Sequence, residues 1–312
     1  MSAADLTAGI LVAPDLTAKR SWRSVKSAMM TGLMVASVIA VAVPLVAVVW
    51  AVFARGLRVA IHGFPAFFVA EIPVIARRPG PGMGPAILGT LLATGAATLI
   101  SVPLGVAGAV YLHEYGVANR FSRLVRFMAN VMTGVPSIVM GLFVYVTWTL
   151  RFGYSAFGGA LALACLMLPV VIGATEQMLK LVPNHLREAS YAVGKTKIAT
   201  VRRILLPTAR PQVATGAMLG LGRIIGDTAI IVVLLGATQN FAPVGSTFPL
   251  NYLRGAGTTL TNFVYEASPT GNLNQPQKAY AAAFVLLLMV LALNAAVDVV
   301  HRRARKVGTW SS

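Results

Sequence analysis

Arg223 and Asp227 are the residues whose types and spacing most clearly suggest chemistry. They stand four residues apart in an apolar segment, so one continuous helix would place both side chains on the same face. A charge inside a bilayer is costly and usually faces a partner or a water-filled path. Two interpretations stay open: a self-neutralising pair that fixes helix packing, or a pair that lines a path for an anion, which the planar guanidinium suits.

Other patterns that would indicate catalysis are missing from the sequence. Neither paired carboxylates nor a nucleophile elbow occurs, and the single cysteine, Cys165, lies in an apolar segment. The run Gly194-Lys195-Thr196 resembles the end of a phosphate-binding loop, but Ala189 stands where that loop needs its first glycine. We therefore expect no catalytic residue, no metal site and no cofactor on this chain.

An enzyme active inside the membrane is a further alternative, which the ionised residues disfavour. Besides Arg223 and Asp227, the ionised residue that we consider near or within the apolar segments is Glu176. We interpret Glu176 as an interfacial carboxylate close to Lys180, four residues further along.

The composition is that of a membrane protein. Of the 312 residues, 57% are hydrophobic and only 11% are charged, whereas soluble domains are about one quarter charged. The net charge of +17 would suggest nucleic acid in a soluble chain, but cytoplasmic loops rich in Lys and Arg explain it here. We expect no nucleic-acid partner.

The apolar segments predict an all-α polytopic protein with six transmembrane helices. The predicted spans cover residues 28–54, 86–112, 127–149, 158–179, 211–237 and 279–300. With both termini inside, 18 Lys and Arg residues fall in inside segments and 7 in outside segments, as the positive-inside rule requires. The predicted organisation is a cytoplasmic tail (1–27), a first helix (28–54), an external loop (55–84), a transmembrane domain (85–303) and a second cytoplasmic tail (304–312).

The longest polar stretch with helical order runs from Leu186 to Pro207, within a predicted cytoplasmic loop (181–209). Its apolar residues fall on one face of each of two short helices: Leu186, Ala189 and Val193, then Ile198, Val201, Ile204 and Leu205. Gly194 lies between the helices, where a chain reversal needs a residue without Cβ strain. Pro207 is expected to close the second helix. The external counterpart is the loop 238–278.

This loop resembles the cytoplasmic signature of the transmembrane subunits of bacterial ABC importers. That signature has Glu-Ala-Ala, a glycine six residues after the Glu, and Ile-x-Leu-Pro ten residues after the glycine. The matching residues are Glu188, Ala189, Ser190, Gly194, Ile204, Leu206 and Pro207, with Lys195 directly after the glycine. The resemblance implies that these residues form a coupling helix that docks on a separate ATPase subunit.

Three further stretches are similar to the phosphate importer permeases, more to the PstA type than to the PstC type. They are 82–91, 134–139 and 222–229. The resemblance implies a translocation path through five residues: Pro136, Ser137, Arg223, Asp227 and Thr228. Asp227 stands where that family commonly has Glu.

The resemblance implies the fold of a type I ABC importer transmembrane domain and a function in ATP-driven import of inorganic phosphate by alternating access. The implied location is the plasma membrane. The implied partners are a PstC-like permease, two ATPase subunits that hold ATP and Mg, and an external phosphate-binding protein. Two alternatives stay open: a permease for another oxyanion or small solute, and an ion-coupled secondary transporter.

Overall fold

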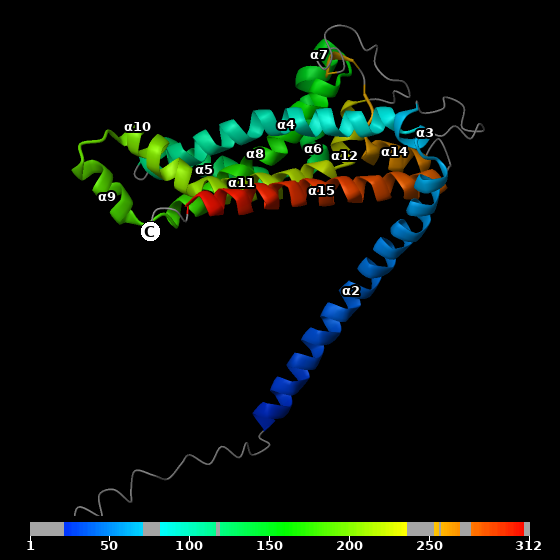
Figure 1. The fold of residues 1–312 in the computed structure, drawn as a ribbon, viewed down its shortest axis with the longest axis horizontal. Helices are drawn as coiled ribbons and strands as arrows, with labels where there is room; N and C mark the ends of the chain where they lie inside the picture. Colours follow the sequence, from blue (N-terminus) through cyan, green and yellow to red (C-terminus); the bar gives the residue numbers. More distant parts are fainter. Residues whose placement is uncertain are drawn as a thin grey trace, which may run out of the picture. The chain divides into compact units, whose positions relative to one another are not determined.

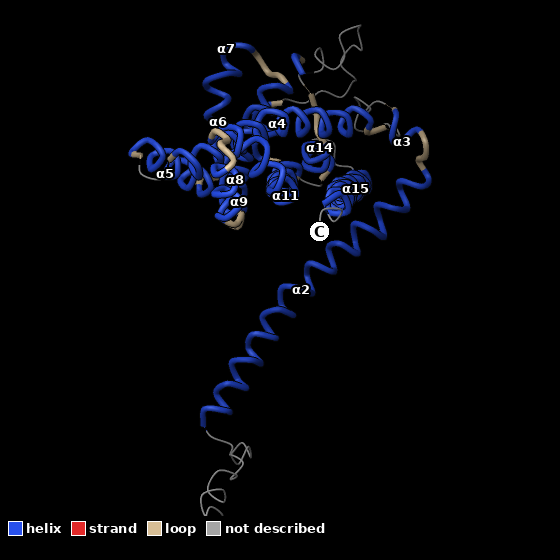
Figure 2. Tube along the Cα trace, turned by 60° about the vertical axis from the view of Figure 1, so that its left-hand side comes forward, coloured by secondary structure: helices blue, strands red, loops and turns tan. Residues whose placement is uncertain are grey.

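The structure, a computed structural model, describes residues 22–70, 82–116, 119–235, 253–255, 257–268 and 276–308. The described residues form helices and turns without a strand, which confirms the all-α class (Figure 2). They fall into two compact units, and the boundary along the chain lies between Ala51 and Val52. Helix α2 (Trp22–His62) contains the first predicted span and contributes to both units.

Helices α4 (Gly84–Val110) and α8 (Ala156–Lys180) form the centre of the second unit, and each matches a predicted span. A π-helical turn, η1 (Tyr111–Tyr115), extends α4. The two helices approach closely at Gly105, where an added Cβ would lie 2.7 Å from Cγ1 of Val171. Alanines, leucines and methionines of α8 fill the main core with residues of α4 and of the helices described next.

The third predicted span is not one straight helix. Helix α5 (Arg120–Gly134) is followed by a run made of α6 (Ser137–Val144), the π-helical turn η2 (Tyr145–Thr149) and α7 (Leu150–Phe152). The two parts are bent by 110°. Val135 adopts an extended conformation (ψ 128°), because the ring of Pro136 disfavours a helical conformation in the preceding residue.

The fifth predicted span begins earlier than expected and is interrupted. After α9 (Asn184–Ala192), a continuous helical run consists of α10 (Lys197–Thr200), η3 (Val201–Leu205) and α11 (Leu206–Ile225). A separate helix, α12 (Ala229–Leu234), follows. The expectation that Pro207 closes a helix is wrong. Pro207 is the second residue of α11 and lies inside the continuous helical run, just after the π-helical turn η3.

The remaining helices are α3 (Ala66–Val69), α14 (Leu260–Ala267) and α15 (Pro276–Gly308), which contains the sixth predicted span. They share a second core with the last turns of α2. The start of α14 is fixed to α4, because Leu260 N donates a 2.9 Å hydrogen bond to Oγ1 of Thr90.

The number of spans is only partly as expected. Four of the described helices are long and apolar enough to cross a membrane, or five if the bent pair counts as one span. Residues Val213–Ile225 form a shorter apolar helix. Figure 1 shows α9 and α10 at one end of the second unit's long helices, with α3 and α14 towards the other.

Candidate functional site: the α9–α10 hairpin

The reversal between α9 and α10 has the backbone conformation that the sequence predicts. Gly194 has φ +77°, a left-handed conformation that residues with a Cβ rarely adopt. Its N–H donates to Tyr191 O at 2.9 Å, and the N–H of Lys195 donates to Ser190 O at 3.2 Å. These two bonds form a Schellman motif, which satisfies the last carbonyl groups of α9. Thr196 then begins α10, and its hydroxyl accepts a 3.4 Å bond from Ala199 N.

A buried hydroxyl pair joins the two arms of the hairpin. Oγ of Ser190 on α9 lies 2.8 Å from Oγ1 of Thr200 on α10, and both side chains are buried. Ser190 replaces the second alanine of the importer signature, so the substitution adds a hydrogen bond rather than removing a contact.

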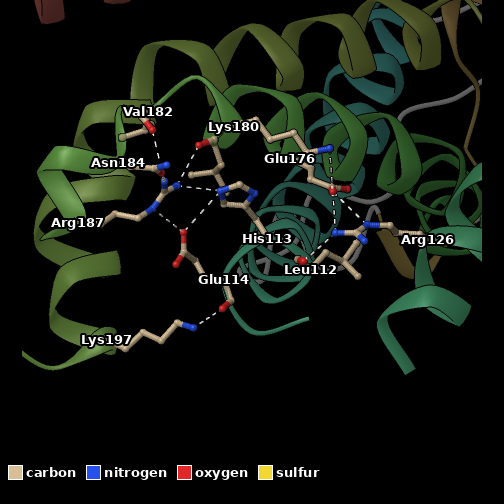
Figure 3. Close-up of polar contacts among 11 residues, drawn as sticks. Leu112, His113, Glu114, Arg126, Glu176, Lys180, Val182, Asn184, Arg187 and Lys197 are labelled. Carbon is tan, nitrogen blue, oxygen red and sulfur yellow. Dashed lines mark hydrogen bonds and ion pairs between the residues drawn. The ribbon is translucent and has the colours of Figure 1, made fainter. Parts of the chain in front are cut away.

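Arg187 anchors the hairpin to two other helices (Figure 3). Its guanidinium donates to Oε1 of Glu114 on η1 at 3.2 Å and contacts Nε2 of His113 at 2.8 Å. It also donates to the carbonyls of Leu179 at 3.2 Å and Val182 at 3.4 Å, at the end of α8. A single side chain therefore donates to one carbonyl in the last turn of α8 and to one just beyond that helix, and it neutralises a carboxylate in η1.

Lys197 makes the corresponding contact from the second arm. Its ammonium donates to the main-chain carbonyl of Glu114 and lies 4.6 Å from the ring centroid of Tyr115. Both arms of the hairpin are thus attached to the same π-helical turn. Movement of the hairpin as a body requires either that η1 moves with it or that these contacts break.

A second cluster joins α5 to α8 beside this attachment (Figure 3). Arg126 donates to Oε1 of Glu176, with Nη2 at 2.9 Å and Nε at 3.1 Å, and also to Leu112 O at 2.9 Å. Lys180 lies 3.3 Å from the same carboxylate oxygen, which confirms the expected pairing of Glu176 and Lys180. The role of Arg126 was not foreseen.

The residues expected to contact an ATPase differ in exposure. Glu188, Ala189 and Lys195 are exposed, whereas Ile204, Leu206 and Pro207 are partly buried. The expected apolar faces are only partly correct. Val201 and Leu205 pack in a small core with Leu179 and Val182, whereas Val193 and Ile198 at the tip are exposed. The tip therefore presents apolar side chains together with charges.

The expected pairing of Arg223 with Asp227 is not formed. Helix α11 ends at Ile225, so the two side chains do not share a helical face. Oδ1 of Asp227 instead accepts a 3.1 Å bond from Ile230 N in the first turn of α12. Arg223 is exposed, and it has no carboxylate partner among the described residues.

The other expected path residues lie at two interruptions in the helices. Pro136 stands between α5 and α6, Ser137 is the first residue of α6, and Thr228 stands between α11 and α12. The two following helices pack together: a Cβ added to Gly141 of α6 would lie 3.3 Å from Cα of Ile230 in α12. Each of the two interruptions is therefore followed by a short helix, and these two short helices, α6 and α12, are neighbours.

The attachment residues carried no recognisable pattern in the sequence. Glu114 and Arg187 are 73 positions apart, and nothing in either local stretch indicates the other. Their only signal was a charge next to the end of an apolar segment. Within the described residues, no group of three or more His, Cys, Asp and Glu side chains is placed to hold a metal ion.

Comparison with known proteins gives matches over most of the chain. A family model described as "Binding-protein-dependent transport system inner membrane component" matches residues 101–306. The "Phosphate transport system permease protein PstA 1" of Mycobacterium tuberculosis (strain CDC 1551 / Oshkosh) is 38% identical over 287 residues, covering 89% of this chain and 90% of the relative. The "Phosphate transport system permease protein PstA" of Haemophilus influenzae is 33% identical, covering 88% and 93%.

Two solved structures share the fold. A chain of the MetNI methionine ABC transporter in its inward facing conformations matches with a TM-score of 0.54 at 22% identity, covering 70% of this chain and 91% of that chain. A chain of a bacterial alginate ABC transporter, in complex with an alginate pentasaccharide-bound periplasmic protein, matches with a TM-score of 0.58 at 16% identity, covering 91% and 98%.

Proposed function

Because the chain belongs to the binding-protein-dependent transport system inner membrane component family and has the fold of a type I ABC importer transmembrane domain, we propose that it imports inorganic phosphate by ATP-driven alternating access. The substrate rests on the likeness to phosphate permeases over nearly the whole chain. The observation that carries the coupling mechanism is the hairpin with its attachment to α4 and α8.

In this mechanism, the hairpin is the element that a separate ATPase subunit moves. The exposed Glu188 and Lys195 supply charges, and the exposed Val193 and Ile198 supply the apolar surface of the contact. Arg187 and Lys197 pass the displacement to η1 and therefore to α4, with which η1 is continuous. ATP and Mg²⁺ bind to the ATPase subunits, and this chain binds no cofactor.

The proposed translocation path runs beside the two helix breaks. Arg223 is the group that contacts the anion, since Asp227 is engaged with α12 and no other carboxylate among the described residues pairs with the guanidinium. A planar guanidinium can donate two hydrogen bonds to a phosphate. Thr228, Pro136 and Ser137 line the same path at the starts of the short helices.

The proposed assembly places this chain beside a PstC-like permease in the plasma membrane. Two ATPase subunits would bind on the cytoplasmic side and a phosphate-binding protein outside, with both termini of this chain in the cytoplasm. We propose the same domain organisation as the sequence predicts: a first helix (28–54), an external loop (55–84) and a transmembrane domain (85–303).

Uptake by the reconstituted complex tests this function. We expect proteoliposomes that contain all subunits, with ATP on the ATPase side, to accumulate labelled phosphate but not sulfate. Arg223→Gln should lower uptake per assembled complex by roughly 10- to 150-fold, because a hydrogen bond to a charged group is worth about 1.5–3 kcal/mol. Arg151→Gln is the matched control, since Arg151 is also exposed but lies on α7.

Two results would contradict the proposal. Import of another solute in place of phosphate would remove the substrate assignment. Undiminished phosphate uptake without the ATPase subunits would indicate an ion-coupled carrier instead.

A further inference from the structure

A pocket lies where the last turns of α2 meet the first two turns of α15, at the end of the second unit away from the hairpin (Figure 1). Its volume is about 300 Å³. Because a water molecule takes up about 30 Å³ in the liquid, the pocket has room for a small anion and several waters. The lining residues all belong to the second unit: Arg55, Arg58 and Val59 of α2, and Pro276, Gln277 and Tyr280 of α15.

Close packing of the two helices fixes the walls of this pocket. A Cβ added to Gly56 would lie 2.5 Å from Cβ of Phe284 and 2.6 Å from the carbonyl oxygen of Tyr280, so α2 approaches α15 as closely as a glycine allows. One turn earlier, the rings of Phe53 and Phe284 meet edge to face, with their centroids 5.5 Å apart. Ala60 continues the contact into the second core. The lining residues are therefore held by packed helices.

Two arginines of α2 line the pocket one helical turn apart. Because residues three positions apart are neighbours on a helix surface, Arg55 and Arg58 lie on the same side of α2. The guanidinium carbon of Arg55 lies 4.9 Å from the centroid of the Tyr280 ring, a cation–π contact that restricts this side chain. Neither guanidinium forms an ion pair or a hydrogen bond with a described residue. Within the described part of the chain, their donors remain available to a ligand.

The pocket lies at the level of a membrane surface. Helices α2 and α15 each contain a stretch long and apolar enough to cross a membrane, and these stretches end at His62 and begin at Pro276. In the orientation that we propose, this surface is the external one, where the positive-inside rule leaves few cations. The sequence nevertheless has seven Lys and Arg residues in its predicted external segments, against two carboxylates, Glu71 and Glu266. Two of these cations in one pocket favour an anionic ligand.

We propose that this pocket binds a phosphate group, with the two guanidinium groups and the side-chain amide of Gln277 as donors. A planar guanidinium donates paired hydrogen bonds to phosphate oxygens, and its charge offsets that of the anion. Inorganic phosphate and the headgroup of a phospholipid both present this group at a membrane surface. The pocket is separate from the proposed translocation path, which lies at the breaks before α6 and α12. The inference does not depend on which solute is imported.

Chemical protection of the arginines tests the proposal. The full-length chain, purified with its associated subunits, is placed in nanodiscs and treated with phenylglyoxal, which modifies accessible arginines. Mass spectrometry then gives the modification rate at each position. The reference bilayer is digalactosyldiacylglycerol, a lipid without phosphate, in sodium chloride. One arm replaces the chloride by inorganic phosphate at equal ionic strength, and the other replaces the lipid by phosphatidylglycerol.

We expect at least one arm to slow the modification of both Arg55 and Arg58 at least threefold. Slowing by inorganic phosphate identifies the free anion as the ligand, and slowing by phosphatidylglycerol identifies the headgroup. Arg151 is the matched control, since it is also an exposed arginine beside an aromatic ring, 6.0 Å from the centroid of Phe152, and does not line the pocket. Its rate should stay the same in both arms.

Arg58→Gln tests whether the two arginines share one ligand. Loss of one guanidinium should return the modification rate of Arg55 to near its reference value, whereas Arg151→Gln should leave Arg55 protected. The proposal is overturned if neither source of phosphate slows the modification of Arg55 and Arg58, or if Arg151 is slowed to the same extent. It is also overturned if Arg58→Gln leaves Arg55 fully protected. If Arg58→Gln does not assemble, the protection of the unmodified chain decides the matter alone.

Discussion

Gly194 and Arg187 have different roles in the hairpin: the glycine sets the direction of the chain, and the arginine fixes the hairpin to the rest of the protein. The first role depends on the backbone alone, since no atom lies within 4 Å of a Cβ built on Gly194. The second depends on four contacts of one side chain with residues outside the hairpin. Substitutions at the two positions should therefore fail for different reasons.

Replacing Gly194 tests the requirement for a left-handed residue. Gly194→Val should strain the reversal by about 1–3 kcal/mol, because β-branched residues resist positive φ. Gly194→Asn should be tolerated, because asparagine adopts this conformation more readily. We expect assembled complexes with valine to lose solute-stimulated ATP hydrolysis and those with asparagine to keep it. Equal activity of the two variants would show that the reversal is not needed for coupling.

Removing Arg187 tests the anchor. Its side chain is 15% exposed and that of Glu114 is 7% exposed, so Arg187→Gln leaves a largely buried carboxylate without its cation. We expect a loss of about 3–5 kcal/mol in stability and faster amide exchange in the hairpin. Lys180→Gln is the control, because Lys180 is 58% exposed and its ion pair should contribute less than about 1 kcal/mol. Similar thermal shifts for the two variants would argue against the anchor.

At this scale, the sequence predicted backbone requirements better than contacts. The positive φ of Gly194 could be predicted from the sequence, because the glycine lies between two short helical patterns, where the chain has to reverse. The Arg223–Asp227 pair was predicted wrongly because it assumed a continuous helix, and Gly226 ends that helix one residue before Asp227. The contact of Glu114 with Arg187 depends on how distant helix ends meet, which no local pattern encodes.

Among the elements, the packing of α4 on α8 depends on small residues at particular positions. A Cβ on Gly105 would lie 2.7 Å from Cγ1 and 2.9 Å from Cβ of Val171, closer than the contacts of ordinary Cβ atoms. Gly95, on the same helix, has no atom within 4 Å of an added Cβ. Only one of these two glycines is therefore required for close approach.

This difference gives a matched pair of substitutions. Gly105→Ala should destabilise the protein by about 1–3 kcal/mol, since α4 must move away from Val171. Gly95→Ala should be neutral or stabilise by up to about 1 kcal/mol, because alanine favours helix. Thermal unfolding of the purified protein measures both. Destabilisation by Gly95→Ala, or none by Gly105→Ala, would contradict the packing described here.

The elements that the sequence predicted well are those with long uninterrupted apolar runs: α2, α4, α8 and α15. It failed where a local signal interrupts such a run. The turn at Pro136 follows from the steric effect of proline on Val135. The proline was visible in the sequence, but the apolar residues on both sides of it led to the prediction of one continuous span. The break after Ile225 has a weaker signal, because glycine is tolerated in membrane helices.

For the whole molecule, the arrangement of charge predicts the orientation in the membrane. The hairpin carries Lys195 and Lys197 in addition to the arginines of η3, whereas the described part of the segment between α12 and α15 has only Arg254 as a cation. The positive-inside rule therefore predicts a cytoplasmic hairpin and an external α14. This orientation is required by the proposed contact with an ATPase, because ATP is found inside the cell.

Cysteine labelling tests this orientation. In a chain whose single cysteine is replaced (Cys165→Ala), Lys195→Cys reports the hairpin and Tyr265→Cys reports α14. Tyr265 is 52% exposed, whereas Thr259 in the same segment is 3% exposed and would not react even on the accessible side. We expect a membrane-impermeant maleimide, added to intact cells, to modify the Tyr265→Cys protein and to leave the Lys195→Cys protein unmodified.

Permeabilised cells provide the control for this experiment, because both cysteines should then react. If Tyr265→Cys fails to react even after permeabilisation, a partner subunit covers α14, and Arg151→Cys on the exposed turn α7 becomes the reporter for the same side. Labelling of Lys195→Cys in intact cells would place the hairpin outside. That result would separate the hairpin from any cytoplasmic ATPase, and the coupling mechanism would fail together with the orientation.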